Sequence, residues 1–490
     1  MSEQYKQEDY KGPTEFVHLH NHTVFSALDG VATPEQYAEQ CVLRGYPAMS
    51  ATEHGHMASV PDMYLAFRKH GIKYIPGCEI YFNDYEPERQ RIEASGFKVR
   101  SPEWRKNNPE LSARISRNRH LTVLCKNEVG YHNLLKLTTQ AYETGLFGMG
   151  QTQYNRIWFD KLCEFKEGLI ILSGCLNGPV CHELRYRKLK NKDGEVVAER
   201  SAGAALDAAV DWVKKFKAEF GEDYYIELQM PGIEAIDQFG EATVRDEDVF
   251  RWLVSIADKF KIQLVLANDC HYLERKDFEL QKLMMAVAQG LTMDSPDLFH
   301  VNSSEQYMKS RPELWARFKN CDYSKGIDDG VFETMCNNTL QIADKCEVFN
   351  VDTSPKIPEI DNADNEIKMI VARRLKSGGF DKDKRRFLID GLKVTYVEQA
   401  KIELNRFIDK GFSSYFLITR ELVKYGRQRG WPFSPRGSAG GSLVCYLMEI
   451  HTLDPMLWGL SFNRFLSPSR GGYMLNIEMP SPIDDASFLH

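Results

Sequence analysis

The sequence predicts an α/β fold in which a parallel sheet closes into a barrel and a mainly helical segment follows. Between about residues 16 and 275, short apolar runs alternate with segments of helical period. Seven of the apolar runs are rich in Val, Ile, Tyr and Phe, as buried strands are. Strands that alternate with helices favour parallel pairing through crossover helices, and seven in succession favour a closed barrel.

The predicted strands and helices of this first part follow one another along the chain. The strands are expected at Phe16–His20, Tyr46–Thr52, Lys73–Phe82, His120–Lys126, Gly168–Gly174, Tyr224–Gln229 and Gln263–Asn268. The helices are expected at Pro34–Arg44, Met57–His70, Val129–Gln140, Ala204–Phe220 and Asp246–Phe260.

Residues 276–430 form a different pattern, in which helical segments dominate. They are expected at Phe278–Gln289, Ser304–Phe318, Asp328–Cys346, Asn365–Lys376, Tyr396–Lys410 and Tyr415–Arg429. The polar, proline-containing stretch Asp352–Asp364 predicts a loop between subdomains. After Trp431, a Gly/Ser-rich turn leads into an apolar helical run, Ser442–Ile450.

The composition excludes some classes of protein. The chain has 490 residues, 43% of them hydrophobic, which supports about two to four domains with ordinary cores. No apolar run approaches the ~20 residues of a membrane span, and the polar start of the sequence is not a secretory signal. The 11 cysteines are scattered singly, which indicates a reducing compartment. We therefore expect a cytoplasmic protein, in a bacterial cell or, if the source is viral, in the host cytoplasm. The net charge of −7 neither suggests nor excludes a nucleic-acid partner.

Side chains that bind metals recur where the predicted strands end. In a parallel barrel these ends share one rim, so residues far apart in the sequence would meet there. HxH and DxH pairs add to the signal, because residues i and i+2 of a strand face the same side. A single histidine or cysteine in such a place is more often structural, so their recurrence carries the prediction. The candidates are His20, His22, Asp29, His54, Glu79, His120, Cys175, Asp269 and His271.

These residue types favour a cluster of metal ions. Imidazole, carboxylate and thiolate suit Zn²⁺, Mn²⁺ or Fe. Nine candidates exceed the needs of one tetrahedral ion, so two or three divalent metals that share ligands are expected. Such a cluster can make hydroxide at neutral pH and stabilise both oxygens of a phosphoester displacement.

Six segments, in this order, resemble a known family. They read FVHLHNHTVFSALDG, SATEHG, IPGCEIYF, HLTVLCKNEVGYHNLLKL, GLIILSGCLNG and ANDCHYL. They resemble the PHP domain of DNA polymerase III alpha subunits, the bacterial-type family C polymerases, which is a distorted seven-stranded barrel with a multinuclear metal site. The resemblance implies that all nine candidates are metal ligands, with Asp269, His271 and Glu79 as catalytic residues of a proofreading 3′–5′ exonuclease. Glu53 stands where an Asp is usual, and we expect it beside the ligands, not among them.

A second motif, PRGSAGGS at 435–442, predicts a phosphate-binding turn. Small residues let backbone N–H groups approach an anion, and Ser438 and Ser442 add hydroxyl donors. Arg436 adds a guanidinium fork, and the helical run that follows would add its N-terminus. A plain surface turn explains the motif equally well when it stands alone.

The surrounding sequence looks like the palm of the same polymerase family. It reads GFSSYFLITRELVKYGRQRGWPFSPRGSAGGSLVCYLMEIHTLDPMLWGLSFNRFLSPSR, with Pro435 in place of a usual glycine. In the family the matching segment binds the triphosphate of the incoming nucleotide. The resemblance implies that role for Arg436, Gly437, Ser438, Gly441 and Ser442. It also implies primer–template DNA, deoxynucleoside triphosphates, other replisome subunits and Mg²⁺ as partners and cofactor.

The resemblance breaks where the family has a strand reading PDIDID, whose first two aspartates hold the metals of nucleotidyl transfer. The sequence reads GGYMLNIEMPSPIDDASFLH instead. Aligned on the methionine, Asn476 and Glu478 take the aspartate positions, and aligned on Pro482, Ile483 and Asp485 do. Neither gives the pair that a shared metal site needs. We therefore expect a fragment, a split-gene product or a diverged member that does not polymerise alone. A second chain with the remaining palm, thumb and fingers could complete it.

Together these patterns predict four regions and leave three functions open. The regions are a tail (1–15), a PHP metal-hydrolase domain (16–276), a helical first part of the palm (277–430), and a nucleotide-binding palm segment (431–490), truncated or diverged at its end. The functions are a polymerase alpha subunit or its N-terminal fragment with an exonuclease site, a stand-alone PHP proofreading nuclease, and a non-catalytic replisome scaffold. The complete ligand set counts against the scaffold. The basic stretch 89–119 is either a solvated loop or a DNA contact.

Overall fold

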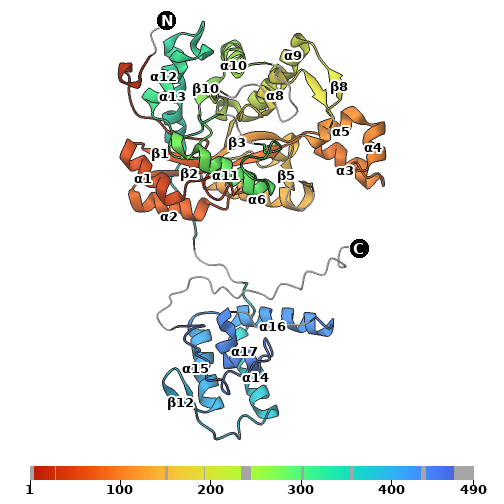
Figure 1. The fold of residues 1–490 in the computed structure, drawn as a ribbon, viewed down its shortest axis with the longest axis vertical. Coiled ribbons are helices and arrows are strands. Elements are labelled where there is room, and N and C mark those ends of the chain that lie inside the picture. Colours follow the sequence, from red (N-terminus) through yellow and green to blue (C-terminus); the bar gives the residue numbers. More distant parts are fainter. Residues whose placement is uncertain are drawn as a thin grey trace. The chain divides into compact units, whose positions relative to one another are not determined.

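A computed structural model describes most of the chain. The described residues are 5–27, 29–148, 153–191, 194–232, 244–299, 303–353, 358–431 and 437–467. The chain divides into two compact units, Met1–Asp352 and Thr353–His490, and each is described by itself (Figure 1).

The first unit is built around an eight-stranded sheet. Its strands are β1 (Ala48–Ala51), β2 (Lys73–Phe82), β3 (Arg119–Cys125), β4 (Leu146–Phe147), β5 (Tyr154–Ile157), β6 (Leu169–Leu172), β9 (Tyr224–Leu228) and β10 (Gln263–Leu266). They lie in the order β10–β9–β6–β3–β2–β5–β4, and β1 also pairs with β2. β1, β6 and β9 are buried along their whole length, so their sequences are short apolar runs and not alternating ones.

The segment before β1 closes this sheet into a barrel. His18 forms a parallel bridge with Met49 of β1, and Asn21 forms one with Cys270, which follows β10. The predicted barrel is therefore confirmed, in a distorted form. The predicted strand Phe16–His20 is joined to its neighbours by isolated bridges and not by a continuous ladder.

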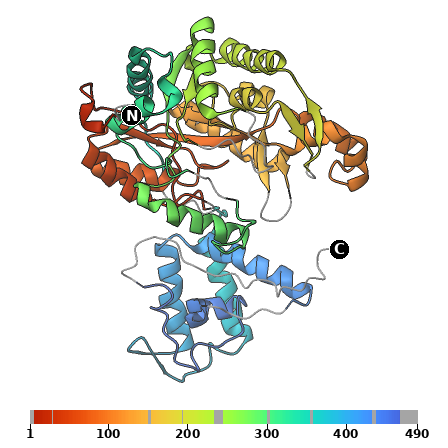
Figure 2. The same ribbon diagram turned by 45° about the horizontal axis from the view of Figure 1, so that its top comes forward.

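The five predicted helices of this part are confirmed within a few residues at their ends. They are α1 (Pro34–Arg44), α2 (Val60–His70), α6 (Glu128–Thr144), α9 (Ala202–Phe220) and α10 (Asp246–Phe260). Local signals fix the ends of α1, because the Thr33 side chain accepts a hydrogen bond from the Gln36 N–H, and Gly45 has φ of 68° after the last turn. Helices lie on both sides of the sheet (Figures 1 and 2).

Two predictions about this part of the chain are wrong, one on the direction of a strand and one on the stretch that precedes it. β3 runs antiparallel to both of its neighbours, β2 and β6. The stretch 89–119, predicted as a loop, contains most of α3 (Glu86–Ala94) and all of α4 (Pro102–Asn107) and α5 (Pro109–Ser116). These three helices lie beyond one end of the sheet (Figure 1). The chain therefore enters β3 at the same end of the sheet where it left β2, so the two strands run antiparallel.

Smaller elements complete the unit. They are α7 (Phe159–Glu164), α8 (Pro179–Arg185), the hairpin of β7 (Lys188–Lys190) and β8 (Val196–Glu199), and the single 3₁₀ turns η1 (Gln7–Asp9), η2 (Gly221–Asp223), η3 (Arg275–Asp277) and η4 (Asp322–Ser324).

Three further helices belong to the first compact unit, which ends at Asp352. They are α11 (Phe278–Gln289), α12 (Arg311–Asn320) and α13 (Asp329–Lys345). The predicted end of the PHP domain at residue 276 stays a prediction. Phe318 and Phe332 join the core that the barrel helices share. The predicted helix Ser304–Phe318 begins only at Arg311, because Tyr307 bridges to Tyr272 as extended chain.

The second unit is mainly helical, as predicted. It contains α14 (Ala363–Ser377), the hairpin of β11 (Phe387–Ile389) and β12 (Leu392–Val394), α15 (Tyr396–Asp409), α16 (Ser413–Gln428), η5 (Gly437–Gly441) and α17 (Leu443–Leu447). Its core includes the stacked rings of Phe407 and Phe416, 3.9 Å apart. In the described part of the chain, none of the helices has the length and apolar character that crossing a bilayer demands.

Candidate metal centre

The structure brings all nine predicted metal ligands together at the ends of neighbouring strands. His20 and His22 lie on the closing segment, Asp29 follows it, His54 follows β1, Glu79 lies on β2, His120 on β3, Cys175 after β6, and Asp269 and His271 after β10. Three groups of these residues hold their ligand atoms within 4.8 Å of one another. Their role as ligands stays a prediction, which the geometry below supports.

The first group consists of His20, His22, Glu79 and Asp269. Nε2 of His20 lies 2.8 Å from Oε2 of Glu79 and 3.4 Å from Oδ1 of Asp269. Nε2 of His22 lies 3.3 Å from each of the same two oxygens. Two imidazoles and two carboxylates therefore point at one small volume, as the ligands of a single ion do.

The second group consists of His22, His54 and His271. The His22 ring stacks on those of His54 and His271, with centroids 4.1 and 4.4 Å away. Asp29 joins this group, because its carboxylate lies 3.1 Å from Nε2 of His54 and 3.5 Å from Nε2 of His271.

The third group consists of Glu79, His120 and Cys175. Oε1 of Glu79 contacts Nδ1 of His120 and lies 3.3 Å from Nδ1 of His54. Sγ of Cys175 lies 3.8 Å from Nδ1 of His120. Glu79 thus belongs to two groups, through one oxygen in each, and could bridge two ions.

In this site, burial and neighbouring positive charges shift the pKa values of the carboxyl groups in opposite directions. Burial opposes ionisation of Glu79, but His120 and His54 hold the pKa of its carboxyl well below the usual range. His54 and His271 do the same for the pKa of Asp29 against the same effect of burial. Ionised carboxylates in a buried site need positive partners. Bound divalent ions would displace imidazolium protons in that role.

Two buried atoms at the centre, Nε2 of His22 and Oδ1 of Asp269, lie 3.3 Å apart, and among the described residues neither makes a hydrogen bond of good geometry. Buried polar atoms without a partner are rare in folded proteins and often mark an ion. Asp269 also has φ of 50°, a left-handed conformation that is uncommon for residues other than glycine and clusters at functional sites. Both observations fit a metal centre.

A further layer of residues orients the histidines. Nδ1 of His20 lies 2.7 Å from Oε1 of Glu227, a buried acid on β9. Nδ1 of His22 lies 3.0 Å from the Ser26 hydroxyl, which donates to Glu53 at 2.5 Å. Glu53 therefore supports the ligands from behind, as expected. Glu227 was missed by the sequence analysis, although an acid in the apolar run YYIEL was a signal for it.

The second motif takes a different form from the one predicted. Arg436 and Pro435 lie outside the described residues, as do Asn476, Glu478, Ile483 and Asp485. Gly437 and Ser438 are exposed and Gly441 is buried, all within η5.

Ser442 is engaged inside the second unit. Its hydroxyl donates to the buried carboxylate of Glu403 at 2.7 Å. The N–H groups of Leu443 and Val444 donate to the same carboxylate, at 3.0 and 2.9 Å, and Gln399 donates at 2.8 Å. Burial raises the pKa of Glu403 to about 7, against the effect of these four donors. Glu403 thus satisfies the start of α17, where a phosphate was expected. Nucleotide binding by Arg436, Gly437, Ser438, Gly441 and Ser442 stays a prediction.

Two family models match the chain. A PHP domain matches residues 18–231, and a bacterial DNA polymerase III alpha NTPase domain matches residues 368–474. A crystal structure of a protein described as a metal-dependent phosphoesterase from Bifidobacterium adolescentis covers 53% of this chain at 12% identity, with a TM-score of 0.28. A likeness of that size carries no argument.

The curated relatives include alpha subunits of DNA polymerase III from several bacteria. Those of Campylobacter jejuni and Mycobacterium leprae are 29% and 32% identical, each over 93% of this chain. That of Aquifex aeolicus is 30% identical over the same share. The chain spans 35% of the length of each of these three relatives.

Proposed function

We propose that the chain belongs to the family of bacterial DNA polymerase III alpha subunits, which the two family models and the curated relatives support, and that its first unit is a metal-dependent phosphoesterase that removes nucleotides from the 3′ ends of DNA. The observation that carries this proposal is the set of three contiguous ligand groups, with His22 and Glu79 each shared by two. A scaffold would not need all nine residues in one place.

The residues divide the work of such a site. Glu79 would hold two ions at a fixed separation, because each of its oxygens faces a different group. Asp269 and His271 would complete the site at the end of β10, and Glu227 and Glu53 would fix the ring orientations. Two or three divalent ions, Zn, Mn or Fe, would supply an activated water and stabilise charge on the phosphoester.

The wider role rests on the relatives and is also a proposal. In it, the chain takes part in DNA replication in the bacterial cytoplasm, with primer–template DNA, deoxynucleoside triphosphates and other replisome subunits as partners. The match at 368–474 supports this role for the second unit. Mg²⁺ would be needed for synthesis.

The test is a nuclease assay with purified full-length chain, Mn²⁺ or Zn²⁺, and 3′-labelled single-stranded or mismatched DNA. Asp269→Asn and His22→Ala should each lower the rate by at least ~10². Asn tolerates the left-handed backbone of Asp269, so this variant removes the charge and keeps the fold. His132→Ala, at a histidine that is 60% exposed on α6, is the control.

Two outcomes would contradict the proposal. One is equal activity in wild type, Asp269→Asn and His22→Ala, which identifies a contaminating nuclease. The other is a protein that has no activity with any divalent ion, although elemental analysis shows enough bound metal to fill the three ligand groups. That result would favour the scaffold.

A further inference from the structure

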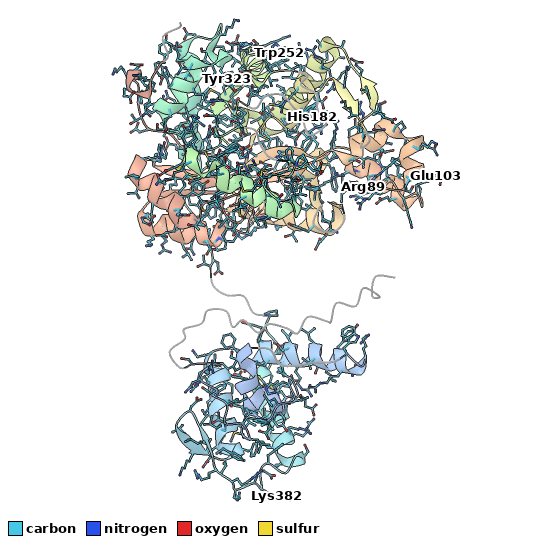
Figure 3. The ribbon with its side chains drawn as sticks, viewed as in Figure 1. Arg89, Glu103, His182, Trp252, Tyr323 and Lys382 are labelled. Atoms are coloured by element: carbon cyan, nitrogen blue, oxygen red, sulfur yellow. The ribbon has the colours of Figure 1, made fainter. Side chains whose placement is uncertain are left out.

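A buried histidine outside the metal centre lies among arginines. His182, on α8, is 4% exposed, and its ring stacks on that of Tyr186 at 4.5 Å (labelled in Figure 3). Its Nδ1 is buried and has no hydrogen-bond partner among the described residues. Arg117, Arg119, Arg185 and Arg200 surround it and are called the arginine cluster below.

The contacts of the cluster come from three separate segments. Nη1 of Arg117 lies 3.3 Å from Nε2 of His182. The guanidinium groups of Arg117 and Arg185 lie over the Tyr186 ring, 5.7 and 5.5 Å from its centre. Nη2 of Arg200 donates to the Tyr186 carbonyl at 3.1 Å. Residues before β3, at the end of α8 and after β8 are thus held around one aromatic ring.

The local charge is positive. Burial lowers the pKa of His182 well below its usual range, and each of the four arginines adds to this effect, so the ring is neutral. Like charges held together in a partly buried place repel one another, and Glu183 offsets this repulsion at Arg200, whose Nη1 it contacts through Oε2.

The cluster lies beside the metal centre along two segments of chain. Arg119 is the neighbour of His120 on β3, and α8 begins four residues after Cys175. The two segments are tied together, since the His120 N–H donates to the Asn177 carbonyl at 3.2 Å. Adjacent residues of a strand face opposite sides, so Arg119 lies on the side of β3 opposite to His120.

We propose that the arginine cluster binds a phosphate of a nucleic-acid strand whose 3′ end reaches the metal centre. The guanidinium fork matches phosphate oxygens, and Arg117, Arg119 and Arg200 are only half-buried and can be reached from solvent. The identity of the strand rests on the proposed function above, whereas phosphate binding itself does not.

Binding can be tested without catalysis. Fluorescence anisotropy with a labelled dT12 oligonucleotide and full-length chain in EDTA should show binding that weakens with salt. Arg117→Gln/Arg185→Gln should weaken it about tenfold and flatten its salt dependence. Arg117→Lys, which keeps the charge, should retain most of the affinity. Arg245→Gln, at a side chain that is 56% exposed just before α10, is the matched control.

A second measurement uses only the wild type, in case the variants fold poorly. Phenylglyoxal modifies arginines, and dT12 should protect Arg117 and Arg200, which solvent can reach, from it, as mapped by mass spectrometry. Inorganic phosphate is the other probe. Protection by phosphate but not by dT12 would overturn the strand assignment, and protection by neither, with unchanged affinity in the double variant, would overturn the site.

Hydrolysis of bis(p-nitrophenyl) phosphate separates this inference from the proposed function. This small diester needs the metal centre alone, so Arg117→Gln/Arg185→Gln should hydrolyse it at the wild-type rate. If the wild type fails to hydrolyse it or DNA, the proposed function fails, and the anisotropy result still decides the phosphate site. Loss of diester hydrolysis in the double variant would overturn the separate binding role.

Discussion

Glu227 accepts a hydrogen bond from Nδ1 of His20 at 2.7 Å, while Nε2 of the same ring lies 2.8 Å from Glu79. Both acids are buried, on β9 and β2, so the histidine is fixed between two strands that do not pair with each other. A carboxylate behind a histidine fixes the ring and strengthens it as a ligand. Glu227 on β9 therefore fixes the position of His20, a predicted ligand.

The first prediction concerns this pair. Glu227→Gln should lower metal affinity about 10- to 100-fold, because the amide no longer offers two anionic oxygens to His20 and Thr122. Titration calorimetry with Mn²⁺ or Zn²⁺ measures the change. Glu88→Gln, at a 45% exposed acid on α3, should bind as the wild type does. Equal affinity in both variants would show that Glu227 does not position the ligand.

The second prediction concerns pH. His18 is buried, with Nε2 2.9 Å from the Lys309 carbonyl, and burial lowers its pKa to about 3. The unfolded chain has a histidine pKa of about 6.5 and takes up the proton first as the pH falls. Protonation of His18 therefore leaves the free energy of unfolding unchanged above about pH 6.5. As the pH falls from there to about 3, it lowers the free energy of unfolding by on the order of 5 kcal/mol.

This pH effect is measured as a difference between proteins. Native-state hydrogen exchange at the amides of β1 gives the free energy of opening of the barrel between pH 7 and 4. The advantage of the wild type over His18→Asn should shrink as the pH falls. His132→Asn, at an exposed site, should follow the wild type. Parallel curves for wild type and His18→Asn would refute the assignment.

The convergence of the nine candidate ligands could be predicted because chemistry and periodicity coincide at them. His20 and His22 are two residues apart in extended chain, and the ends of neighbouring strands meet whatever the details of the barrel. Glu227 could not be ranked in the same way. It lies inside a strand and not at its end, and only the structure shows that its side chain faces His20.

The direction of β3 and the extent of the first unit were not predictable from the pattern. An apolar run shows that a strand is buried but not which way it runs. The direction depends on three short helices, α3 to α5, that begin with prolines and turn the chain back. Likewise, α13 belongs to the first unit, where Asn338 donates to the carbonyl of Leu264 on β10. No local sequence pattern predicts this contact.

The third prediction is that this polypeptide does not extend a primer. Nucleotidyl transfer needs two ions held by paired carboxylates. Residues 471–490 offer Asn476, a weaker neutral ligand, and Glu478, whose longer reach misplaces an ion. Asp484 and Asp485 are adjacent and would face opposite sides of a strand.

A gel assay with labelled primer–template DNA, deoxynucleoside triphosphates and Mg²⁺ tests this prediction. Efficient extension by this chain alone would mean that Glu478 or Asp485 replaces the missing pair.

The fourth prediction concerns the buried carboxylate of Glu403 and its replacement by an amide of nearly the same shape. Its two oxygens accept the N–H groups of Leu443 and Val444 separately. In Glu403→Gln, either orientation of the amide turns an NH₂ group toward one of these N–H groups and leaves it unpaired. We expect a loss of about 3 kcal/mol in the second unit, because a buried unpaired donor is costly. Hydrogen exchange at the α17 amides measures it, with Glu421→Gln, 59% exposed, as the control. If protection of α17 is unchanged in Glu403→Gln, the carboxylate does not cap this helix, and the start of α17 is free for the phosphate that the sequence predicts.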